Sequence, residues 1–189
     1  MWPWAHLGLG YLLFRATPAG RTRPIDGVAV LALAFGTQFP DLVDKPLAWY
    51  LGVLPSGRSL AHSVLTLVVV VGAVAVVARR RGRPSAAYGF AVGYVSHLVG
   101  DAYGHVLAGD FRQLTFLGWP LTPVADYGDE PGLLYRLQHL VVEPQVAFGL
   151  ALAAAVLALW LRDGAPGLVE LRGLGRWTAD RLGRSADRW

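Results

Sequence analysis

Long apolar stretches separated by short polar or Pro- and Gly-rich segments dominate the chain. Two of these stretches, residues 60–78 and 145–161, are uniformly hydrophobic and predict membrane-crossing helices, because about 20 apolar residues span the hydrocarbon layer. Residues 86–109 have helical spacing but carry polar side chains, and two shorter apolar segments, 3–15 and 27–39, precede them. The pattern predicts an all-α fold, a polytopic membrane helical bundle of about five helices.

The remaining segments predict a loop and a tail at the membrane surface. Residues 110–135 have the Gly, Pro and aromatic content of a loop near the interface. From residue 168 onward, Leu and Trp alternate with Arg, which predicts an interfacial amphipathic helix. We therefore expect a membrane-embedded domain, 1–162, and an amphipathic cytoplasmic tail, 163–189. We also expect the N-terminus to be retained, because MWPWAHLGLGYLLF lacks the basic region and cleavage site of a secretory signal.

The composition limits the chemistry that the chain can carry. Of 189 residues, 54% are hydrophobic and 16% charged, and the mean hydropathy is +0.41, well above an ordinary soluble domain. The sequence has no cysteine, which excludes disulfides and thiolate zinc sites, so a metal must be held by His, Asp or Glu. The net charge of +4 fits contact with anionic membrane lipids, and we expect no nucleic-acid partner because the tail arginines alternate with apolar residues.

The basic residues predict the orientation of the bundle. If the five helices alternate in direction, thirteen of the seventeen Lys and Arg residues fall at one end, which the positive-inside tendency makes cytoplasmic. The other end keeps only Lys45, Arg58, Arg112 and Arg136. All five histidines fall at that second end. The histidine-rich end is therefore expected on the non-cytoplasmic side of the cell membrane.

Metal-binding residue types recur there at helical spacing. Residues four apart share a helix face, so His97 pairs with Asp101, Asp101 with His105, and His139 with Glu143. Ionisable side chains in apolar helices are costly unless they are paired or coordinated. Zn²⁺ takes three or four such ligands, and a bridging carboxylate such as Asp101 can serve two ions. Facing helices of a bundle supply converging side chains of this kind.

Simpler roles stay open for individual residues. A single histidine is commonly a hydrogen-bonded core or interfacial residue. Asp41 and Asp44 lie in FPDLVDKP, and each is either a metal ligand or simply a residue of a helix end or turn. Taken jointly, the concentration of these side chains at one end favours a metal site.

Several short motifs in the first 110 residues resemble the YdjM-like membrane-bound metal-dependent hydrolases. They are His6, the FPD of residues 39–41, RSLAHS at 58–63 and SHLVGD at 96–101. The order of ligand-type residues along the chain is also similar to that of the zinc-dependent phospholipase C and P1 nuclease superfamily, helical enzymes with three zinc ions. The resemblance implies a phospholipase C-like centre with two or three zinc ions or other divalent metals. The implied ligand sets are Asp41, His62, His97 and Asp101; His105, His139 and Glu143; and His6 and Asp101 with the N-terminal backbone.

Such a centre predicts phosphoester hydrolysis. Neighbouring zinc ions generate hydroxide near neutral pH and stabilise an in-line displacement at phosphorus, on a small-molecule or lipid phosphoester. Asp41 is the candidate for orienting or deprotonating the attacking water, and it is equally a candidate for a ligand only. Arg58 is the candidate for contacting the phosphate, with a salt bridge or a lipid-headgroup anchor as its alternative role.

Two other functions remain possible at this point. A non-catalytic membrane protein that conducts protons or metal ions would need polar residues through the membrane depth, yet residues 64–78 and 146–160 offer one threonine. A structural bundle whose polar end binds a partner would contain no stoichiometric metal.

Overall fold

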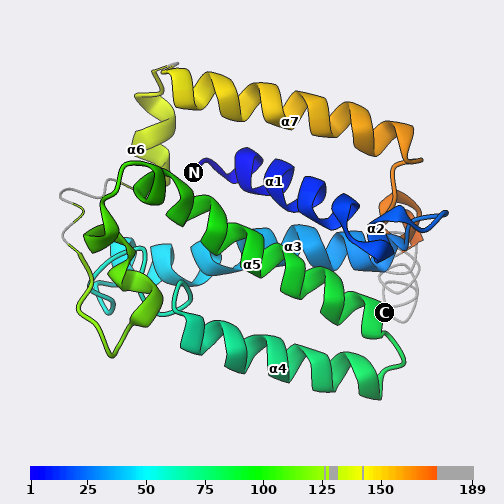
Figure 1. The fold of residues 1–189 in the computed structure, drawn as a ribbon, viewed down its shortest axis with the longest axis horizontal. Coiled ribbons are helices and arrows are strands. Elements are labelled where there is room, and N and C mark those ends of the chain that lie inside the picture. Colours follow the sequence, from blue (N-terminus) through cyan, green and yellow to red (C-terminus); the bar gives the residue numbers. More distant parts are fainter. Residues whose placement is uncertain (126, 128–131, 142, 174–189) are drawn as a thin grey trace, which may run out of the picture.

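The structure is a computed structural model that describes residues 1–125, 127, 132–141 and 143–173. Within these residues the chain is all-α and has no strand. Each predicted apolar segment forms one long helix, and these helices lie side by side (Figure 1). The long helices are α1 (Pro3–Ala16), α3 (Gly27–Lys45), α4 (Val64–Arg80), α5 (Pro84–Leu107) and α7 (Pro144–Arg162). The short elements are α2 (Pro18–Arg21), the π-helix η1 (Pro46–Tyr50), the 3-10 helix η2 (Phe111–Gly118) and α6 (Leu133–Gln138).

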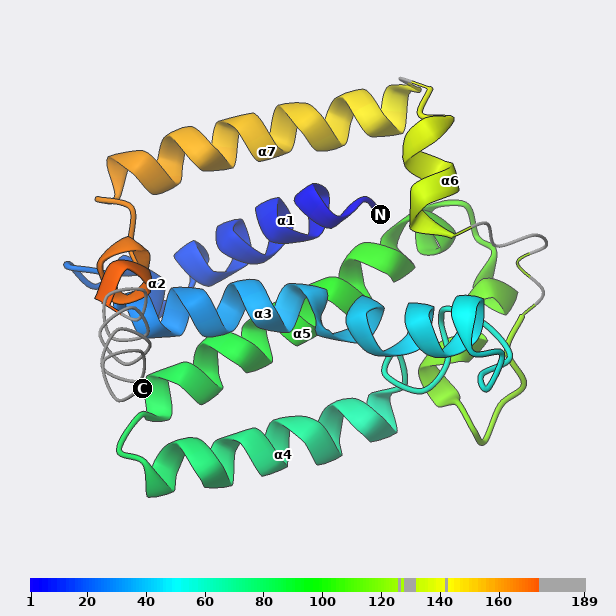
Figure 2. The ribbon, with the colours of Figure 1, turned by 180° about the vertical axis from the view of Figure 1, so that it is seen from behind.

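Successive long helices run in opposite directions, so their connections gather at two ends of the bundle (Figures 1 and 2). One end, which we call the site end, holds the N-terminus, residues 46–63 and α6. The other, which we call the arginine end, holds α2 and the turn between α4 and α5. Among the described residues, the basic residues at the arginine end include Arg15, Arg21, Arg23, Arg79, Arg80, Arg81, Arg83 and Arg162.

Two helix starts differ from the sequence prediction. The helix expected from residue 60 begins at Val64, because the Ser63 side chain caps it by accepting a hydrogen bond from the Leu65 amide (3.1 Å). His62 therefore precedes the helix and lies on the irregular segment 51–63. The expectation that His139 and Glu143 begin the last helix on a shared face is wrong. Helix α7 begins after Glu143, at Pro144, since proline is well suited to the first helical position.

Close packing of α3 against α5 brings the central side chains together. A Cβ atom on Gly89 or Gly93 of α5 would collide with the carbonyl oxygens of Ala29 and Leu33 on α3. Small residues at these positions let the two backbones approach closely, as in many membrane bundles. Next to Gly93 on α5, the Tyr94 hydroxyl donates a hydrogen bond to the Ala61 carbonyl oxygen (2.5 Å). The same helix pair thus also fixes the segment that carries His62.

The surface of the bundle is unusually apolar. Large hydrophobic side chains are exposed on all five long helices, and Val68 and Val69 of α4 are 65% and 70% exposed. In the described part of the chain, one helix, α7, is both long and apolar enough to span a membrane, with a mean hydropathy of 1.9. Helix α4, which the sequence predicted as a second span, has 17 residues and is too short for that criterion. Exposed apolar surface of this extent is typical of a protein that contacts lipid or another apolar partner.

The predicted amphipathic tail lies largely beyond the described residues. Residues 168–173 are helical. Residues 174–189, which include Trp177 and the last four arginines of the tail, are outside the described ranges.

Candidate metal centre

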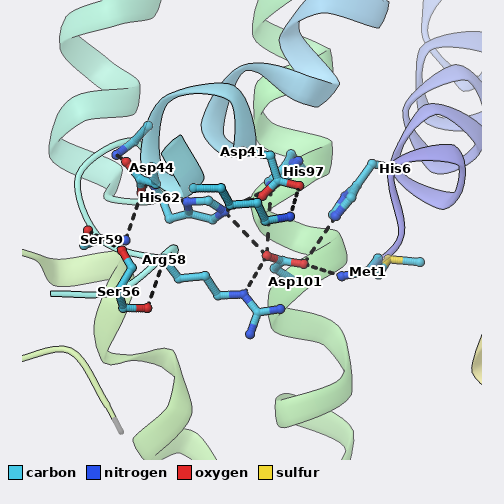
Figure 3. Close-up of polar contacts among 12 residues, drawn as sticks. Met1, His6, Asp41, Asp44, Ser56, Arg58, Ser59, His62, His97 and Asp101 are labelled. Atoms are coloured by element: carbon cyan, nitrogen blue, oxygen red, sulfur yellow. Dashed lines mark hydrogen bonds and ion pairs between the residues drawn. The ribbon is translucent and has the colours of Figure 1, made fainter. Parts of the chain in front are cut away.

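Five of the predicted ligands converge at the site end (Figure 3). His6 comes from α1, Asp41 from α3, His62 from the segment before α4, and His97 and Asp101 from α5. All five are buried, and the three histidines are no more than 1% exposed. Two overlapping groups have metal-ligand spacing, one of His6, Asp41 and His97, the other of His62, His97 and Asp101. The contacts link positions up to 95 residues apart in the sequence, so they depend on the tertiary fold.

Four ligand atoms of this cluster lie close to the two histidine Nε2 atoms or are those atoms themselves. His62 Nε2 is 3.1 Å from His97 Nε2, 3.5 Å from Asp41 Oδ1 and 3.6 Å from Asp101 Oδ2. His97 Nε2 is 3.7 Å from Asp41 Oδ1 and 3.9 Å from Asp101 Oδ2. Tetrahedral zinc bonds of 2.0–2.2 Å place neighbouring ligand atoms roughly 3.3–3.6 Å apart. His62 Nε2, His97 Nε2 and Asp101 Oδ2 therefore form one compact group with the spacing of metal ligands, and Asp41 Oδ1 lies beside both histidine nitrogens.

Hydrogen bonds fix how the two central histidines point. His62 Nδ1 lies 2.8 Å from Asp44 Oδ2, and His97 Nδ1 lies 2.7 Å from the Thr37 carbonyl oxygen. A carbonyl oxygen only accepts, so His97 Nδ1 carries a proton, and a neutral His97 has its lone pair on Nε2. Both Nε2 atoms are thereby directed at the centre of the cluster. Metal-binding histidines are oriented in this way by a carboxylate or carbonyl on the second ring nitrogen.

The environment of His62 favours positive charge. Burial disfavours the charged imidazolium, but the carboxylates of Asp101, Asp41 and Asp44 outweigh burial and raise the pKa of His62 to about 10. The lone pair of a neutral His97 faces His62 Nε2. Two unprotonated nitrogens at this distance would repel each other through their lone pairs, and a proton or a metal cation between them removes that repulsion.

Asp44 organises the segment that carries His62, a role that the sequence left open. Its carboxylate is fully buried and accepts from the backbone amides of Ser59 (2.8 Å), Ala61 (2.8 Å) and His62 (3.3 Å). These amides lie outside any helix, and the carboxylate satisfies their hydrogen bonds in place of a helical ladder. The available sequence signal was the spacing of Asp44 from Asp41, three residues apart on one helix face.

Asp101 is shared between several partners. Its Oδ1 lies 2.7 Å from the Met1 amino group and 3.3 Å from His6 Nε2, while Oδ2 accepts from Arg58 Nε at 2.9 Å. The His6 ring also stacks on His97, with ring centroids 3.8 Å apart. The residues of the implied third zinc set thus lie beside the first set and share Asp101 with it.

Two polar groups of the cluster are buried without regular hydrogen bonds among the described residues. Asp41 Oδ1 has none, although Lys45 donates to the other oxygen of Asp41. Neither ring nitrogen of His6 makes one. A buried acceptor left unsatisfied costs about 1–3 kcal/mol, and a coordinated cation is one way to satisfy it. The donor set of imidazole and carboxylate therefore fits a divalent metal.

The implied second set is not gathered to ligand distance within the ranges that the structure describes. His105 follows Asp101 by one turn of α5. His139 is exposed, stacks on Tyr135 and directs Nδ1 at the Tyr135 carbonyl (2.9 Å). Glu143 is exposed at the start of α7. All three line one cleft with Asp101, of about 930 Å³.

Arg58 also lines that cleft. Its guanidinium group is bound to Asp101 through Nε and lies 5.3 Å from the centre of the Tyr127 ring. The side chain is 29% exposed, so part of the fork remains accessible from the cleft. The ion pair with Asp101 confirms the salt-bridge role that the sequence allowed and leaves a phosphate contact to be tested.

The comparisons with known proteins agree with the sequence resemblance. Residues 1–124 match the family described as YdjM inner membrane protein. The matched region contains all five residues of the cluster and all of helices α1 to α5. No curated protein and no solved structure matches the chain.

Proposed function

The chain belongs to the YdjM inner membrane protein family, and from this premise and the geometry of the cluster we propose that it is a membrane-bound, metal-dependent phosphoester hydrolase. The observation that carries the proposal is the group of His62, His97 and Asp101 ligand atoms, 3.1–3.9 Å apart, with Asp41 Oδ1 at 3.5 and 3.7 Å from the two histidine nitrogens. The hydrogen bonds from Asp44 and the Thr37 carbonyl hold both histidine rings with Nε2 toward the cluster. Such orienting contacts are typical of metal-binding histidines and support a metal site here.

We assign His62, His97 and Asp101 as ligands of one divalent ion, preferably zinc. Imidazole and carboxylate suit zinc, and catalytic zinc sites keep three protein ligands with a fourth position for water. Asp41 Oδ1 lies 3.5 Å from His62 Nε2 and 3.7 Å from His97 Nε2, where it would either complete the ligand set or accept a proton from the attacking water. His6, on the far side of Asp101, is assigned to a second ion that shares this carboxylate. A bound ion of this kind lowers the pKa of water and stabilises charge at phosphorus.

The protein residues supply binding and proton transfer. Arg58 faces the cleft beside Asp101 and is assigned to hold a phosphate oxygen, because its guanidinium is already oriented by Asp101 and Tyr127. In the reaction the oxygen of water bonds to phosphorus and the ester P–O bond breaks. One proton of the water is accepted by Asp41 if that side chain is not a ligand, and otherwise by solvent. The leaving oxygen takes up a proton from solvent, and the products are an alcohol and a phosphate.

We further propose a multi-pass topology with the centre on the non-cytoplasmic side. The exposed apolar side chains on all five long helices support burial in lipid. The arginines gathered at the opposite end support a cytoplasmic location for that end.

The test is metal analysis joined to turnover in detergent-purified protein. We expect wild type to contain zinc and to hydrolyse p-nitrophenyl methyl phosphate, and Asp101→Ala to lose both the metal and the activity. Asp110→Ala is the matched control, because Asp110 is exposed and lies outside the cluster. Wild-type protein without stoichiometric metal, or His97→Ala with full turnover, would contradict the proposal.

A further inference from the structure

A second hollow of the molecule, an apolar groove, lies at the arginine end. It has a volume of about 440 Å³ and is lined by α3, α4 and the first turn of α5, with Val28, Val77 and Ala86 among its walls. Helices α3 and α4 both pack against α5, but in the described part of the chain no α3 Cα atom comes within 8 Å of one in α4. The groove is therefore a space between two helices that share a neighbour without packing closely on each other.

Two arginines border this groove. Arg81 and Arg83 lie in the turn between α4 and α5, line the groove and are exposed. Arg15 and Arg23 at the same end of the bundle are already paired with Asp163, at 2.8 and 3.0 Å. Among the described residues, no such ion pair holds Arg81 or Arg83, so their charges are available to an anion.

The residues that line the groove carry no negative charge. Residues 46–100, which include all of α4 and the first part of α5, contain no Asp or Glu. Two acidic side chains lie near the start of α3, but neither lines the groove. Asp26 caps the helix by accepting from the Val28 amide (2.9 Å), and the Glu170 carboxylate lies against Gly27.

The apolar wall runs along the bundle, away from the two charges. From Arg81 to Ala73, α4 contributes the groove wall over a rise of about 12 Å, at about 1.5 Å per residue. Val77 in this stretch is 53% exposed. A cationic mouth joined to an apolar channel along the helix axis matches a phospholipid, whose phosphate lies at the membrane surface and whose acyl chain points into the hydrocarbon.

We propose that the groove binds one anionic phospholipid, with its phosphate at Arg81 and Arg83 and one acyl chain along Val77 and Ala73. The planar fork of arginine suits phosphate oxygens, and basic pockets between membrane helices on the cytoplasmic side bind acidic headgroups. The inference goes beyond the proposed hydrolysis, because the groove lies at the opposite end from the metal centre. The proposed topology places this lipid in the cytoplasmic leaflet, where it fills the space between α3 and α4.

The arginine turn supplies a matched pair of charge variants. Native mass spectrometry of detergent-purified protein measures the affinity for the first molecule of dioleoylphosphatidylglycerol. We expect Arg81→Gln/Arg83→Gln to weaken this binding about 30-fold, at about fivefold per arginine. Arg79→Gln/Arg80→Gln removes the same charge from exposed residues that do not line the groove. This control should change the affinity less than about threefold, because about 0.15 M salt screens charges that do not contact the phosphate.

A second pair of variants tests the acyl chain. Ala73 is exposed and lines the groove, so Ala73→Phe places a ring in the path of the chain. We expect about tenfold weaker binding of dioleoylphosphatidylglycerol, the usual size of steric exclusion from an apolar pocket. Gly72→Phe is the control, because Gly72 is exposed, does not line the groove and has open space at its Cβ position. Inorganic phosphate in large excess should not displace the lipid, since it lacks the chain.

Other results overturn the inference. Equal losses in the two arginine pairs would show general attraction to a basic surface, and equal affinities of Ala73→Phe and Gly72→Phe would exclude a chain in the groove. Displacement by inorganic phosphate, or a first lipid bound no more tightly than later ones, would exclude the site too. All four variants should keep the zinc content and turnover of wild type, so failure of the proposed hydrolysis is seen separately in wild type.

Discussion

Replacing Asp44 by asparagine isolates the role of one buried carboxylate behind the centre. Asp44 Oδ2 accepts hydrogen bonds from the backbone amides of Ser59 and His62 and lies against the His62 ring nitrogen Nδ1. Asp44 Oδ1 accepts a hydrogen bond from the backbone amide of Ala61. Asparagine with its oxygen in the Oδ2 position keeps the first three contacts. Its NH₂ group then faces the Ala61 N–H, so that two buried donors face each other without an acceptor between them.

The expected magnitudes follow from these contacts. Each unsatisfied buried donor costs about 1–3 kcal/mol of stability. The neutral amide also makes His62 a weaker ligand, and loss of such a partner typically lowers metal affinity about 10- to 100-fold, or about 1.4–2.8 kcal/mol. We therefore expect Asp44→Asn to fold, with a reduced free energy of unfolding and zinc affinity lowered by this factor.

The assay is competition for zinc between the detergent-purified protein and a chelating dye of known affinity. Asp26→Asn is a suitable control because Asp26 caps the opposite end of the same helix, accepting from Val28 (2.9 Å), and asparagine caps equally well. Zinc affinity of Asp44→Asn within twofold of this control would refute the account of how His62 is held.

Further predictions concern the reaction, the helix packing and the topology. Asp41→Asn should abolish turnover. If the variant still binds zinc, Asp41 is the proton acceptor; if it loses zinc, Asp41 is a metal ligand; and full activity would exclude both roles. Gly93→Val should push α3 away at Leu33, at a cost of about 1–3 kcal/mol, and reduce bound zinc; unchanged stability and zinc content would contradict the close packing. Because the chain has no cysteine, Val53→Cys and Arg81→Cys report topology directly. In intact cells an impermeant maleimide should label the first and spare the second, and the reverse pattern would invert the proposed orientation.

The sequence predicted the helices well because their apolar runs are long and their ends carry proline or capping residues. The pair His97 and Asp101 was predictable for the same reason, since both lie within one regular helix and spacing alone sets their shared face. His6 and Asp41 also point to the centre, each from a long helix.

Residues near breaks in the helices were harder to predict. His139 and Glu143 have the same spacing as His97 and Asp101, but Pro144 starts a new helix after them, so the spacing has no geometric meaning there. His62 reaches the centre from an irregular segment whose course depends on Asp44 and Tyr94. Interactions of this kind join distant positions and have no local signature in the sequence.

The proposed ligands all precede residue 102, and α7 packs on the outer side of α1. A ribosome therefore delivers every one of these side chains before it begins to synthesise α7. Early parts of a chain can fold while later parts are still being made. The proposed ligands can then come together in the nascent chain, and α7 packs on α1 afterwards.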